Sequence, residues 1–139
     1  MTPGHFEQIK AFTKNWYDEH ASPESQKQLF AEESALNCAL SNFTRLGLDG
    51  IVILIDNKIA AYALGMPLNQ TCYDGFMEKA DRSYKYIYKM LNHSVAKYCK
   101  DSIKWLNWEE DLGEEGLRRM KMSWKPEFLL KKFLAAEKD

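Results

Sequence analysis

The chain has 139 residues, of which 45% are apolar and 13% aromatic, and its formal net charge is −1. This length and composition are typical of one folded domain and exclude a disordered chain. The balanced charge argues against general binding of DNA or RNA, although it leaves room for a local basic patch. The longest apolar run, residues 51–55, is far shorter than the roughly 20 residues of a transmembrane helix. We therefore expect a soluble, cytoplasmic protein.

Two helices are predicted at the N-terminal end. Apolar residues recur at helical spacing from His5 to His20. Ser22 is placed to cap a second helix with Pro23 at its first position, and Gly47 is suited to end it. The inner face of the second helix is expected to carry Leu29, Leu36, Leu40 and Phe43.

Three strands are predicted next. Residues 51–55 form a continuous β-branched run, and a tight turn at 56–58 leads into residues 59–66, so we expect these two segments to pair as a hairpin. Residues 71–80 predict a third strand. Within it, Gly75 indicates either a bulge or a close approach of another group to the backbone.

A third helix is predicted from Tyr84 to Cys99. Its broad apolar face comprises Tyr84, Ile87, Tyr88, Leu91, Val95, Tyr98 and Cys99. Asn92 lies at the margin of this face. Because an unpaired polar group there costs about 1–3 kcal/mol, we interpret Asn92 as a structural hydrogen-bonding residue.

The stretch from Ile103 to Trp124 gathers the polar residues best suited to chemistry. A short strand at 103–108 runs into the acidic residues 109–111 and then into a helix over about 113–122. Ligands of open α/β sheets bind where strands end and helices begin, so we look for function here.

A structural role for the same acidic residues stays open. Asp111 and Glu114 have the spacing of a capping box, and capping is the commoner role of acidic residues at a helix start.

Pro126 ends the helix, and residues 128–135 are open between a last strand and a last helix. The whole order describes a layered α/β sheet.

Cysteine and histidine positions form no site pattern. Cys38, Cys72 and Cys99 lack CxxC spacing, and the three histidines are scattered. The sequence therefore predicts neither a disulfide framework nor a metal site.

Three stretches of the chain resemble a known family. They are GLDGIVILIDNKIAAYALG, FMEKADRSYKYIYKMLN and LNWEEDLGEEGLRRMKMSWKP. With this order of elements, the chain is similar to the GNAT acyltransferase fold and, more narrowly, to the C-terminal domain of phosphatidylglycerol lysyltransferases, roughly from Gly47 to Pro126. The resemblance implies a mixed sheet flanked by helices and transfer of an acyl or aminoacyl group to an amine or hydroxyl acceptor.

The resemblance also implies which polar residues form the site. A carboxylate can act as general base, while lysine or arginine can bind a phosphate or a developing oxyanion. The catalytic candidates are Glu78, Glu109 and Asp111, and the substrate-binding candidates are Lys79, Arg82, Lys85, Asn107, Arg118 and Lys121.

One departure from the family pattern concerns the donor. GNAT enzymes that use acetyl-CoA hold its pyrophosphate with a glycine-rich loop before a helix. Residues 81–86 contain no glycine, and Tyr86 stands where many family members have one. This argues against acetyl-CoA, whereas Arg82 and Lys85 suit another phosphate-bearing donor such as aminoacyl-tRNA.

A second departure is that the chain opens on a helix, without the usual first strand of the fold. Since members of the family often have two GNAT-like halves, we expect residues 1–139 to form a single domain that is the C-terminal half of such a protein. Its partner would be an N-terminal GNAT-like half or, in a homodimer, a second copy. The alternative to a transferase is therefore a non-catalytic half with a structural or substrate-binding role.

Overall fold

The computed structural model describes residues 1–20, 26–99, 101, 103–133 and 135–136. By its internal contacts the chain divides into two units, Met1–Glu109 and Glu110–Asp139, each of which is described by itself.

The first unit opens with a short 3-10 turn, η1 (Pro3–His5), and two helices, α1 (Phe6–His20) and α2 (Gln26–Ser41). The helix predicted over 5–20 is confirmed. Ser22, Pro23 and the side chain of Leu29 lie outside the described residues. The prediction that α2 continues to Gly47 is wrong. The Asn42 side-chain amide donates to the Cys38 carbonyl (2.9 Å), and a series of turns follows.

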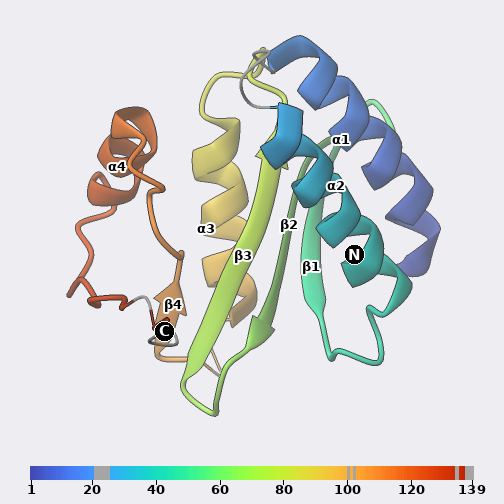
Figure 1. Ribbon diagram of the computed structural model, residues 1–139. Helices are drawn as coiled ribbons and strands as arrows, with labels where there is room; N and C mark the ends of the chain where they lie inside the picture. The colour runs from blue at the N-terminus through green and yellow to red at the C-terminus, as the bar shows by residue number, and fades with distance from the viewer. Residues whose placement is uncertain (21–25, 100, 102, 134, 137–139) are drawn as a thin grey trace. The chain divides into compact units, whose positions relative to one another are not determined.

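A four-stranded mixed sheet forms the centre of this unit (Figure 1). The strands are β1 (Asp49–Ile55), β2 (Lys58–Pro67), β3 (Cys72–Ala80) and β4 (Trp105–Asn107), and they are neighbours in that order. The hairpin of β1 and β2 is confirmed, β3 is antiparallel to β2, and β4 is parallel to β3. The predicted mixed sheet with flanking helices is therefore confirmed.

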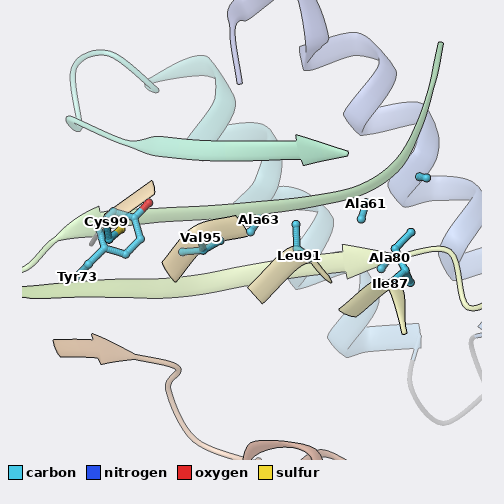
Figure 2. Close-up of a cluster of buried hydrophobic side chains, with 9 residues drawn as sticks. Ala61, Ala63, Tyr73, Ala80, Ile87, Leu91, Val95 and Cys99 are labelled. Carbon is cyan, nitrogen blue, oxygen red and sulfur yellow. The ribbon is translucent and has the colours of Figure 1, made fainter. Parts of the chain in front are cut away.

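Helices cover both faces of the sheet (Figure 1). On one face Ile9 and Leu36, from α1 and α2, pack with Tyr62 and Leu64 of β2. On the other face α3 (Ile87–Cys99) packs its buried side chains on β2 and β3, as Figure 2 shows. The alternation of β2 residues between the two clusters follows from the two-residue period of a strand.

The helix predicted from Tyr84 begins later than expected. Asp81 accepts from the backbone N–H of Ser83 through its side chain (2.9 Å) and from that of Tyr84 through its carbonyl. This turn competes with helix formation, so α3 begins at Ile87. Tyr84 and Tyr98 are exposed, which corrects the predicted apolar face, whereas Asn92 is buried.

Gly75 lies beside a bulge and is also closely approached by another side chain, the two alternatives that the sequence left open. The β2–β3 register shifts between Leu64 and Gly65, so that Phe76 is an extra residue in β3. A Cβ atom at Gly75 would collide with the ring of Trp108. Beyond the bulge, successive side chains of β3 turn to opposite faces of the sheet, which decides where Glu78 and Lys79 point.

In the second unit, α4 (Glu115–Met122) confirms the predicted helix. The predicted capping box of Asp111 and Glu114 does not form. Glu114 is the N-cap residue, and its side chain makes no capping hydrogen bond. Residues 128–133 are neither strand nor helix. No helix in the described part of the chain is long and apolar enough to cross a membrane.

Candidate functional site

Strands β3 and β4 separate soon after they meet. They pair only at Cys72–Trp105, Tyr73–Leu106 and Asp74–Asn107. Among the described residues, no strand pairs with this edge of β3 from residue 75 to residue 80. Backbone donors and acceptors along such an edge can bind a ligand, and ligands of α/β sheets bind at the carboxyl ends of their parallel strands.

Asn107 fixes the chain at the point of separation. Its Nδ2 donates to Oδ1 of the buried Asp74 on β3 (2.7 Å), and its Oδ1 accepts from the backbone N–H of Glu109 (3.2 Å). Glu109 has a positive φ of 54° and an exposed side chain. Asn107, a predicted substrate-binding residue, therefore positions the backbone of Glu109 in this structure.

Glu78 points towards α3. The Asn92 side-chain amide is oriented so that its nitrogen and its oxygen both face suitable partners. In this orientation the Asn92 nitrogen donates to Glu78 Oε2 (2.7 Å) and to the Tyr88 carbonyl oxygen (3.3 Å). Asn92 is thus confirmed as a structural hydrogen-bonding residue. Burial raises the pKa of the Tyr88 phenol, with a smaller contribution from Glu78, while Arg82 acts in the opposite direction. The sequence placed Tyr88 on the apolar face of this helix, but it did not show that the Tyr88 carbonyl accepts from Asn92.

Lys79 points to the opposite face. Its Nζ lies 2.5 Å from Glu32 Oε1 on α2, and 4.8 and 5.4 Å from the ring centroids of Trp16 and Tyr17. Burial, and then the nearby Glu32 carboxylate, raise the pKa of Tyr17. Glu78 and Lys79 are adjacent in the sequence, but the strand places them in different environments.

Trp16 connects α1 to the end of β3. Its Nε1 donates to the Ala80 carbonyl (3.0 Å), and the guanidinium carbon of Arg82 lies 5.2 Å from its ring centroid. A hollow of about 170 Å³ adjoins this ring, and it is lined by Phe12, Asn15, Trp16, Glu19 and Asp81. Helical periodicity predicted the amphipathic helix that contains Trp16, but spacing cannot show that its indole reaches a strand end 64 residues away.

The loop before α3 keeps a glycine-like backbone without glycine. Tyr86 has a positive φ of 66°, in the region that glycine adopts most readily. The Nζ of Lys85 lies 4.9 Å from its ring centroid. The predicted phosphate-binding residue Lys85 therefore lies beside an exposed aromatic ring at the start of α3.

The second unit contains an ion pair that the sequence did not predict. Arg118 donates to Asp111 through Nε (2.5 Å) and Nη2 (3.2 Å), and the Lys121 Nζ donates to the Glu110 carbonyl (2.6 Å). The Arg118 hydrogen bonds, helped by the Gly113 N–H, hold the pKa of Asp111 below its usual value. A carboxylate with a lowered pKa is a weak base, so Asp111 is a poor candidate for that role.

The nine predicted site residues thus fall into two groups. Glu78, Lys79, Arg82, Lys85, Asn107 and Glu109 belong to the first unit, and Asp111, Arg118 and Lys121 to the second. Across the described ranges, no three His, Cys, Asp or Glu side chains are grouped so that they could hold a metal ion.

Comparison with known proteins gives a family match over almost the whole chain. Residues 1–136 match the family described as phosphatidylglycerol lysyltransferase, C-terminal. A solved protein of unknown function from Bacteroides thetaiotaomicron is 34% identical, with a TM-score of 0.86 over 93% of this chain and 43% of its own. An uncharacterised protein of Mycoplasmoides gallisepticum is 24% identical over 91% of this chain and 40% of its own length.

The fold also matches acetyltransferases of similar size. The structure of a possible acetyltransferase from Clostridium difficile 630 is 12% identical, with a TM-score of 0.71 over 100% of this chain and 95% of its own. This likeness concerns the fold alone, and it agrees with the GNAT arrangement of the sheet. By contrast, the chain spans less than half the length of the Bacteroides and Mycoplasmoides proteins.

Proposed function

This chain belongs to the phosphatidylglycerol lysyltransferase C-terminal family, and from that premise we propose that it moves an aminoacyl group to an amine or hydroxyl acceptor. Its GNAT fold and its family make it an acyltransferase-type domain. The observation that carries the proposal is the separation of β3 from β4, with Asn107 at the end of β4 accepting a hydrogen bond from the backbone N–H of Glu109.

The proposed chemistry uses groups at this separation. The Glu109 carboxylate takes a proton from the acceptor, whose nitrogen or oxygen attacks the carbonyl carbon of the aminoacyl ester. A new amide or ester bond forms as the bond to the donor oxygen breaks, and that oxygen leaves with a proton. Backbone N–H groups on the unpaired edge of β3 are suited to stabilise the oxyanion that develops.

Aminoacyl-tRNA is the proposed donor. Residues 81–86 lack glycine, and the positive φ that a glycine would supply belongs to Tyr86, whose side chain stands beside Lys85. Such a loop supports a larger phosphate-bearing donor better than the close backbone contact with a pyrophosphate that acetyl-CoA requires.

A thermal-shift titration tests donor and function together. A ligand of the native state raises the melting temperature by mass action. We expect the melting temperature of the purified chain to rise with an aminoacyl-tRNA mimic and to stay unchanged with acetyl-CoA or CoA. A shift with CoA alone would contradict the proposed donor, and the absence of any shift would favour the second candidate.

The second candidate is a non-catalytic half that associates with another GNAT-like half or with a second copy. It is favoured by Leu129, Leu130 and Phe133, whose side chains are 73%, 75% and 87% exposed in the second unit. Exposed apolar groups of this kind mark protein interaction sites. The share of the longer relatives that this chain spans, 43% and 40%, is consistent with such a half.

A further inference from the structure

The segment that forms α3 and the loop before it is basic and free of acidic residues. Residues 82–99 contain four of the chain's 19 basic residues, Arg82, Lys85, Lys89 and Lys97, and none of its 20 acidic residues. The net charge of −1 therefore conceals a local excess of positive charge. Such a segment attracts polyanions even in a protein that is neutral overall.

The charges lie along one side of α3. Lys89, His93 and Lys97 are four positions apart, which places them on one side of a helix. These three residues are exposed, as is Tyr86, which directly precedes α3. The opposite side is buried against the sheet (Figure 2). We name the exposed side, with the loop before it, the basic face of α3. It consists of Arg82, Lys85, Tyr86, Lys89, His93 and Lys97.

An aromatic ring stands among these charges. The Tyr86 side chain is 63% exposed, and the Nζ atoms of Lys85 and Lys89 lie 4.9 and 5.7 Å from its ring centroid. An exposed ring flanked by cations offers a nucleic acid both a surface on which a base can stack and charges that contact its phosphates.

The composition of the face favours RNA over a lipid surface. Membrane-surface helices bury bulky apolar residues such as Trp, Phe and Leu. The large apolar side chains that residues 82–99 expose are three tyrosines and Met90, while Ile87, Leu91 and Val95 are buried in the core. Tyr98 is not included in the basic face, because it lies beside Asp49 at the other end of α3.

We propose that the basic face of α3 binds the RNA of the aminoacyl donor. This inference rests on the proposed function, because an RNA surface serves the transferase only if its donor is an aminoacyl-tRNA. Arg82 and Lys85 lie at the end of the face nearest the carboxyl end of β3, so RNA bound along α3 would extend towards the separation of the strands.

The test measures binding of a labelled, unacylated tRNA transcript to the 139-residue chain by fluorescence anisotropy at several salt concentrations. The variant Lys85→Gln/Lys89→Gln/Lys97→Gln removes three charges from the face. A matched control, Lys10→Gln/Lys14→Gln/Arg45→Gln, removes three charges from α1 and from the turns after α2. Circular dichroism melts of both variants verify that they fold.

We expect the face variant to bind at least tenfold more weakly at low salt, and the control to bind within about twofold of the unmodified chain. Each lost phosphate contact should reduce the slope of log K against log salt by about 0.7–0.9, or by roughly 2–3 for three contacts. Absence of tRNA binding, equal losses in both variants, or binding of phosphatidylglycerol vesicles in place of tRNA would each overturn the inference.

A parallel transfer assay separates this inference from the proposed function. Face-dependent tRNA binding without any transfer would contradict the transferase and leave the RNA surface intact. Transfer from aminoacyl-tRNA that proceeds unchanged in the face variant would overturn the RNA surface alone.

Discussion

The backbone of Glu109 is held by the side chain of Asn107. The Asn107 amide oxygen accepts from the Glu109 N–H, and Glu109 adopts a backbone conformation that residues other than glycine seldom occupy. A non-glycine residue in this region costs about 1–3 kcal/mol. This cost is borne where the chain leaves β4, at the carboxylate that the proposed function uses as general base.

Replacing Glu109 by Gln should lower aminoacyl transfer by at least about a hundredfold, because general-base catalysis contributes about 10²–10⁴ to the rate. The melting temperature should change little, since the substitution keeps the shape of an exposed side chain. Glu110→Gln, one residue further on, is the control and should keep its activity. Loss of stability with activity retained in Glu109→Gln would refute the catalytic role.

The Asp111–Arg118 pair predicts a defined pH dependence. The pKa of Asp111 is lowered in the folded chain from its ordinary value of 3.8. The pair therefore stabilises the fold above the unfolded pKa, and this contribution is lost as the pH falls through the folded pKa. Below both values it should be absent.

An NMR titration checks this directly. In Arg118→Gln the pKa of Asp111 should rise towards its ordinary value, whereas Arg119→Gln, which removes a neighbouring exposed arginine, should leave it low. The melting temperatures of wild type and Arg118→Gln should differ at pH 7 and converge below the folded pKa of Asp111. An unchanged Asp111 pKa in Arg118→Gln would show that the arginine does not cause the shift.

At the scale of elements, β3 decides which polar residues can act together. The bulge at Phe76 fixes which face each following side chain takes, so that Glu78 meets Asn92 of α3 while Lys79 meets Glu32 of α2. Gly75, just before the bulge, accommodates the Trp108 ring that follows β4. The packing of the Trp108 ring against β3 thus depends on a glycine.

Gly75→Ala should lower the free energy of unfolding by about 1–3 kcal/mol, because the added methyl group displaces a packed indole. Gly116→Ala in α4 is the matched control. No atom lies within 4 Å of its added Cβ, and alanine favours a helix over glycine by up to about 1 kcal/mol. Urea unfolding measures both values. Equal stability of Gly75→Ala and wild type would show that Trp108 moves aside without cost.

At the scale of the whole molecule, the question is what covers the apolar side chains of the second unit. Wild-type chain should associate as its concentration rises, and Leu129→Ser/Leu130→Ser should shift it to a monomer in sedimentation velocity. Leu46→Ser/Leu68→Ser, at two other exposed leucines, should associate like wild type. A wild-type chain that remains folded and monomeric at high concentration would count against pairing with a second copy.

Much of the first unit was predictable because its signals are local. Helical spacing gave α1, a β-branched run and its turn gave the hairpin, and Gly75 indicated the bulge. The start of α3 was predicted too early because Asp81 forms a local turn that periodicity does not include. The capping box failed for a related reason. Asp111 has the spacing to form a capping box with Glu114, but its carboxylate pairs with Arg118, seven residues away.

The sequence by itself determined the class of fold, the family and the polar residues worth testing, since each depends on spacing and residue type along the chain. Only the tertiary structure decided how those residues are used. It separated Glu78 from Lys79, gave Asn107 a positioning role and brought Trp16 to the end of β3. The physical reason is that hydrogen bonds and ring contacts depend on distance in space, and residues 33 to 64 positions apart become neighbours only when the sheet and its helices have packed.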